Sequence, residues 1–76
     1  MSLVDIVMNY YEKVKGKTLR LGIDEVKLEL IRGQKGILIE ITNLATGKKI
    51  YLPPAEFLRR NYINRLQVID DKGDGE

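Results

Sequence analysis

The 76-residue sequence has no cysteine, no histidine and no tryptophan, and it contains a single serine, Ser2. Without cysteine neither a disulfide nor a thiolate metal site can form, which fits a reducing cytoplasm. Without histidine the commonest general base and metal ligand is missing. A Ser–His–Asp or Cys–His site cannot be built, so we expect a protein that is not an enzyme and that uses neither a metal nor another cofactor.

Long apolar runs are also missing. No stretch of about 18 apolar residues is present, and the N-terminus lacks a basic region followed by an apolar segment and a cleavage site. These features predict a soluble, cytoplasmic protein without a membrane segment. The aliphatic content, the Lys-, Glu- and Arg-rich composition and the lack of Cys, His and Trp are typical of a thermophilic source.

Charge is distributed unevenly along the chain. Residues 70–76 (DDKGDGE) carry four acidic residues and one basic residue, and we expect them to form a flexible acidic tail. Residues 1–69, which we expect to form a single small domain, keep 12 basic and 7 acidic residues, a net charge of +5. A body of this sign attracts phosphates, whereas the alternative is a mixed-sign surface that only keeps a small domain soluble.

Residues 3–15 have the spacing of an amphipathic helix. Leu3, Val7, Tyr10 and Val14 form one apolar row, with Ser2 as a cap before it and Gly16 as a stop after it. A second apolar row lies beside the first and contains Val4, Met8 and Tyr11.

From Lys17 onward the apolar period changes to two, which indicates strands. Gly-containing turns separate these segments, so residues 26–52 are predicted to form a meander of hairpins. Pro53 and Pro54 end the fourth strand because neither can donate a ladder hydrogen bond. The predicted strands cover residues 19–23, 26–30, 37–42, 49–52 and 66–69.

A short helix over residues 54–61 is predicted before the last strand, with Phe57 and Leu58 packing inward. The fold class is therefore α+β and rich in β: an N-terminal helix followed by a small five-stranded antiparallel, barrel-like sheet with a short helix before the last strand. We expect this sheet to close into a small barrel, because closure removes exposed edges.

The segment GILIEITNLATGKKIYLPPAEFL (Gly36 to Leu58), a hairpin that leads into a helical turn, resembles Tudor-like and related small barrels. The leading helix, with Gly16-Lys17 before the first strand, resembles the Sm-like variant of that barrel. The resemblance implies the fold, and it transfers no functional residue of either family to this sequence.

Basic residues flank most of the predicted turns. With Tyr51 available for stacking, this pattern is typical of contacts with the phosphates and bases of RNA or DNA. Tyr62 and Phe57 are expected in the core instead, and Glu29 and Glu40 on a solvated face opposite lysines. The predicted nucleic-acid-binding residues are Lys17, Arg20, Arg32, Lys35, Lys48, Lys49, Tyr51, Arg59, Arg60 and Arg65.

The alternative function is a protein–protein interaction or assembly subunit that works through the apolar face of the first helix. A monomer would leave the row of Val4, Met8 and Tyr11 in water, so we predict a homodimer, most simply two-fold, with this row as its interface. In the competing arrangement, residues 63–69 fold over the row and the chain is a monomer.

Overall fold

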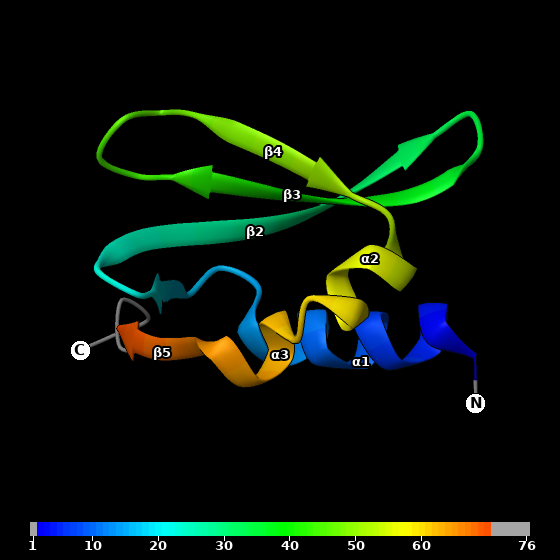
Figure 1. The fold of residues 1–76 in the computed structure, drawn as a ribbon, viewed down its shortest axis with the longest axis horizontal. Coiled ribbons are helices and arrows are strands. Elements are labelled where there is room, and N and C mark those ends of the chain that lie inside the picture. Colours follow the sequence, from blue (N-terminus) through cyan, green and yellow to red (C-terminus); the bar gives the residue numbers. More distant parts are fainter. Residues whose placement is uncertain (1, 71–76) are drawn as a thin grey trace.

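The structure is a computed structural model that describes residues 2–70. The predicted acidic tail beyond Asp70 therefore lies outside the described residues. Figure 1 shows the three helices gathered below the strands β2, β3 and β4. The elements are α1 (Leu3–Val14), β1 (Thr18–Leu21), β2 (Asp24–Gly33), β3 (Gly36–Asn43), β4 (Lys49–Leu52), α2 (Pro54–Arg59), α3 (Tyr62–Arg65) and β5 (Leu66–Asp70).

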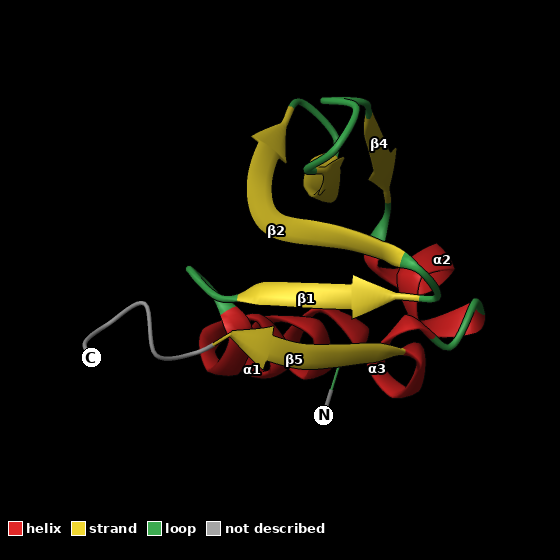
Figure 2. Ribbon diagram, turned by 90° about the vertical axis from the view of Figure 1, so that its left-hand side faces the viewer, coloured by secondary structure: helices red, strands yellow, loops and turns green. Residues whose placement is uncertain are grey.

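The five strands form one antiparallel sheet with the order β4-β3-β2-β1-β5. The predicted α+β class and the hairpin meander are confirmed. β2 is the longest strand: only Asp24–Val26 pair with β1, whereas Val26–Gly33 pair with β3. Figure 2 shows β2 running along β1 and then curving away from it. One long, bent strand thus joins the two halves of the sheet.

The prediction of a closed barrel is wrong, because β4 and β5 form the two outer edges of the sheet. Residues 54–65, which contain α2 and α3, separate these two strands in the sequence. Their aromatic side chains complete the core: Phe57 is 0% exposed and Tyr62 5% exposed, and their rings stack with centroids 5.3 Å apart. Both residues lie in the core as predicted. Helices α2 and α3 pack against β3, β4 and β5, so helices rather than further strand pairing complete the core.

Local signals set the limits of α1. The Ser2 hydroxyl accepts a hydrogen bond from the Asp5 backbone N–H at 3.1 Å, and Gly16 follows the helix with a φ of 78°. Val7 and Val14 of the first apolar row are buried, and α1 packs mainly against α2 and β2. Among residues 2–70, no helix is long and apolar enough to cross a membrane.

Candidate nucleic-acid interface

The predicted nucleic-acid-binding residues do not form one continuous patch. They fall into four groups that the fold separates. The β2–β3 turn and the β3–β4 turn, for example, lie at opposite ends of β3, and a strand of eight residues is about 25 Å long. Figure 1 shows these two turns at the right-hand and left-hand ends of the molecule. The groups are Arg32 and Lys35; Lys48, Lys49 and Tyr51; Lys17 and Arg20; and Arg59, Arg60 and Arg65.

Three arginines of α2 and α3, namely Arg59, Arg60 and Arg65, form what we call the arginine cluster. Arg59 and Arg60 each donate to one carboxylate oxygen of Glu56, one helical turn before them. The guanidinium of Arg65 lies 4.9 Å from the centroid of the Tyr62 ring and donates to the backbone carbonyl of Arg60 at 3.2 Å. Glu56 and Tyr62 therefore hold the three guanidinium groups in place.

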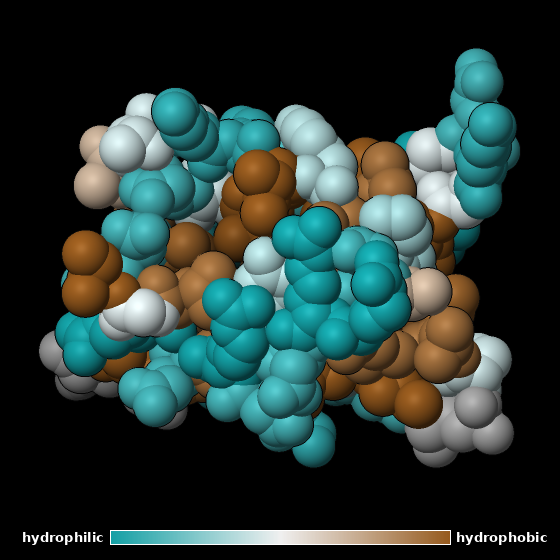
Figure 3. Space-filling view, in the orientation of Figure 1, coloured by the Kyte–Doolittle hydropathy of each residue, from teal (hydrophilic) through white to brown (hydrophobic). Residues whose placement is uncertain are grey.

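The arginine cluster retains positive charge after its internal pairing, because Glu56 pairs with Arg59 and Arg60 only, and Arg65 forms no ion pair among the described residues. Hydrogen bonds from Arg60 and then Arg59 hold the pKa of Glu56 below its usual value, so the carboxylate stays ionised. The side chains of Arg59 and Arg60 are 75% and 54% exposed. Figure 3 shows hydrophilic residues gathered over the region that α2 and α3 occupy in Figure 1.

Two of the three residues in the group at β4, Lys49 and Tyr51, have partners within the chain, whereas Lys48 is exposed before the strand. The Lys49 ammonium lies 3.2 Å from Thr42 Oγ1 and 3.5 Å from Glu40 Oε1. Tyr51 is half exposed, and its hydrogen bond to Glu40 raises the pKa of its phenol. Glu40 therefore offsets the charge of Lys49 and holds the ring of Tyr51, so this group offers an anion less than the arginine cluster does.

Glu29 is exposed as predicted, whereas Glu40 is partly buried, and neither lies directly opposite a lysine. They occupy directly opposed positions on β2 and β3, so the residue across from Glu29 is an acid. Glu29 accepts a hydrogen bond from the Tyr11 hydroxyl at 3.2 Å. The Glu40 side chain is only 12% exposed, because Lys49 and Tyr51 cover it. Two tyrosines and a lysine thus compensate this like-charge pair.

Four further predicted cations lie at two separate places in the fold. Arg20 lies on β1 between Glu25 of β2 and Gln67 of β5. Arg32 and Lys35 are exposed at the end of the β2–β3 hairpin, and Lys17 is half-buried before β1. Within residues 2–70 none of these four forms an ion pair.

The predicted dimer row is only partly free for a partner. Val4 is 37% exposed, whereas Met8 and Tyr11 are half-buried and Tyr11 packs against the core. In the competing arrangement residues 63–69 were expected to cover this row, but β5 pairs with β1, and α2 and β2 provide most of the packing against α1. The homodimer stays a prediction.

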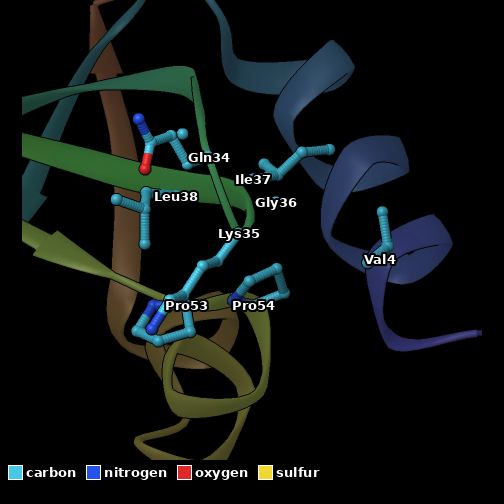
Figure 4. Close-up of a pocket in the computed structure, with 9 residues that line it drawn as sticks. Val4, Gln34, Lys35, Gly36, Ile37, Leu38, Pro53 and Pro54 are labelled. Atoms are coloured by element: carbon cyan, nitrogen blue, oxygen red, sulfur yellow. The ribbon is translucent and has the colours of Figure 1, made fainter.

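Sequence reasoning missed a groove between the β2–β3 turn, the start of α1 and the Pro53-Pro54 segment (Figure 4). In the sequence, the only indication of this groove was the pair of consecutive prolines after the predicted fourth strand.

No protein-family profile, curated protein or solved structure matches this chain. In the part of the chain that the structure describes, no group of three Asp, Glu, His or Cys residues is placed to hold a metal ion.

Proposed function

We propose that this protein is a non-catalytic nucleic-acid-binding module of the cytoplasm that contacts RNA or DNA through the arginine cluster of α2 and α3. One observation carries the proposal: Arg59, Arg60 and Arg65 lie at the C-terminal ends of two consecutive short helices, and a single carboxylate, Glu56, pairs with Arg59 and Arg60. The cluster contains three of the predicted cations, more than any of the other three groups.

The geometry of the cluster suits phosphate groups. A guanidinium group presents a planar set of donors that matches phosphate oxygens, and it stays charged at any physiological pH. Glu56 and Tyr62 restrict the three side chains before a ligand arrives, which lowers the conformational entropy that binding must overcome. Tyr51, the predicted stacking residue, lies on β4 and not on α2 or α3, so the proposal is for contacts to the backbone rather than for sequence recognition.

Fluorescence anisotropy with labelled single- and double-stranded RNA and DNA of random sequence tests the proposal. Binding should weaken as salt increases, because each bound phosphate releases counterions. The double variant Arg59→Ala/Arg60→Ala should bind more weakly, and the slope of log K against log salt should fall by about 0.7–0.9 for each phosphate that the variant no longer neutralises.

A matched control is Lys13→Ala/Lys15→Ala, which removes the same charge from the end of α1. Lys15 pairs with Glu12 at 2.9 Å, so this control also breaks a helical ion pair. If both double variants bind more weakly to the same extent, net charge rather than the arginine cluster determines binding. If the wild type binds none of the four nucleic acids at low salt, the proposal is wrong.

A further candidate function is that of an assembly subunit, in which two copies of the chain form a two-fold homodimer through α1. It is favoured by the exposure of Leu3, 50%, and Val4, 37%, at the start of that helix. Sedimentation equilibrium of the wild type and of Met8→Lys tests it. A dimeric wild type and a folded, monomeric Met8→Lys variant would support the interface, whereas a dimeric variant would exclude it.

A further inference from the structure

The groove beside α1 has apolar walls and a basic rim. It encloses about 620 Å³. Figure 4 shows Leu38 and the two prolines on one side of it, with Ile37 directed toward α1 and Val4. Its only charged lining residue is Lys35, and Arg32 is the nearby cation on the same hairpin. The groove is lined by Val4, Gly33, Gln34, Lys35, Gly36, Ile37, Leu38, Pro53 and Pro54.

An apolar knob with an acidic rim lies elsewhere on the molecule. We define it as the side chain of Ile23 in the β1–β2 turn. Ile23 borders a shallow hollow that is also lined by Asp24, Glu25, and Leu44 and Ala45 of the β3–β4 turn. Ile23 is 95% exposed and Leu44 43% exposed. Figure 3 shows an apolar protrusion at the left-hand end, where the β1–β2 turn lies in Figure 1.

The turn itself does not require an apolar residue at this position. Leu21 pairs with Asp24, so Gly22 and Ile23 form a two-residue hairpin turn, and Gly22 supplies its positive φ of 67°. In such turns glycine serves the backbone and the next position is usually polar. The turn conformation therefore explains the glycine at position 22 but not the isoleucine at position 23. Because the Ile23 side chain is almost fully exposed, it can insert into another surface.

The two surfaces are complementary in charge. Asp24 and Glu25 are exposed beside the knob, and Arg32 and Lys35 are exposed beside the groove. None of these four forms an ion pair with another described residue. An apolar contact with opposite charges at its rim is the arrangement found in specific protein interfaces.

The knob and the groove cannot meet within one chain. They lie at opposite ends of β2, whose ten residues span about 30 Å at the usual rise. This separation runs along the longest dimension of the molecule, 36 Å, as Figure 1 shows. We infer that the chain associates with a second copy of itself head to tail, with the knob of one copy in the groove of the next.

A head-to-tail contact uses two different surfaces, so an open complex of any size keeps one free knob at one end and one free groove at the other. Association should therefore continue beyond the dimer as concentration rises. This distinguishes the inference from the two-fold dimer through α1, which stops at two copies and is sensitive to Met8. The inference does not depend on nucleic-acid binding by the arginine cluster.

Sedimentation equilibrium over a range of concentrations, without nucleic acid, tests the inference on the 76-residue chain. The knob variant is Ile23→Asp, and the groove variant is Val4→Glu, whose new carboxylate also suits the first turn of a helix. Each variant alone should raise the dissociation constant about tenfold or more. Val68→Asp, which replaces an apolar side chain that is 45% exposed on β5, is the matched control and should associate like the wild type.

Mixing the two variants gives the sharpest result. Ile23→Asp retains an intact groove and Val4→Glu an intact knob, so an equimolar mixture should form a dimer of one copy each and nothing larger. This recovery also shows that both variants are folded. A wild type that is monomeric at every concentration, or that stops at a dimer, would overturn the inference. So would a mixture in which no dimer forms.

Discussion

The phenol of Tyr11 on α1 lies 3.2 Å from a carboxylate oxygen of Glu29 on β2 and donates a hydrogen bond to it. Burial, this hydrogen bond and the charge of Glu29 raise the pKa of the Tyr11 phenol above its ordinary value of 10.0. β2 has no strand partner on its β1 side beyond Val26 within the described residues, since β1 pairs only with Asp24–Val26. Tyr11 therefore covers part of an open strand edge, which would otherwise be free to pair with another chain.

Tyr11→Phe tests this contact, because it keeps the ring and removes the hydrogen bond from the hydroxyl to Glu29. We expect unfolding to become easier by about 0.5–1.5 kcal/mol, the usual net worth of such bonds. Urea unfolding followed by circular dichroism measures the change. Tyr51→Phe is the control, because its bond to Glu40 lies on a half-exposed residue of an edge strand and should contribute less.

The elements of the fold were predictable where a local signal marks them. The predicted helix over residues 3–15 is observed as Leu3–Val14, and the fourth strand is observed as Lys49–Leu52, as predicted. Ser2, Gly16 and Pro53 mark these ends by capping, by positive φ and by the absence of a donor. These effects act over a few residues, so a single sequence is enough to detect them.

Features that depend on distant residues were not predicted. α3 has four residues, too few for a periodic pattern, and the open sheet depends on whether β4 meets β5, which no local pattern determines. The basic residues were assigned to one footprint because they flank turns. Arg32 and Lys48 flank turns at opposite ends of β3, so they cannot share a site.

Asn61 joins α2 to α3 in a left-handed conformation, with a φ of 61°. Its side-chain oxygen accepts a hydrogen bond from Asn64 Nδ2 at 2.7 Å. Asparagine tolerates this conformation better than other residues with a Cβ atom. We expect Asn61→Ala to destabilise the fold by about 1–2 kcal/mol and Asn61→Gly to cost less, because glycine adopts this φ freely.

Thermal unfolding of the three proteins measures this difference. Asn64→Ala is the control for the side-chain hydrogen bond, since it removes the bond without changing the backbone at residue 61. Equal destabilisation by Asn61→Ala and Asn61→Gly would show that the side chain, rather than the left-handed backbone, determines the choice of asparagine.

Phe57 is the central aromatic residue of the core. It is 0% exposed and contacts Tyr62 and Tyr10, with ring centroids at 5.3 Å and 6.1 Å. We expect Phe57→Ala to cost about 3–5 kcal/mol, most of the stability of a domain of this size. Phe57→Leu should stay folded and be destabilised by about 1–1.5 kcal/mol. Chemical denaturation measures both, and a Phe57→Ala variant as stable as wild type would contradict the assigned core.

Alkaline pH should weaken the fold through Tyr10. Burial raises the pKa of the Tyr10 phenol above its ordinary value of 10.0, so the folded chain holds this proton more tightly than the unfolded chain. The resulting stabilisation is complete below the ordinary pKa and is lost as pH rises from there through the folded-state pKa. Urea unfolding at pH 8, 10 and 11 should therefore show stability that falls above about pH 10.

Tyr10→Phe keeps the ring against Phe57 and cannot ionise, so the stability of this variant should fall less steeply over the same pH interval. Equal slopes for the two proteins would show that other groups, not Tyr10, cause the alkaline destabilisation.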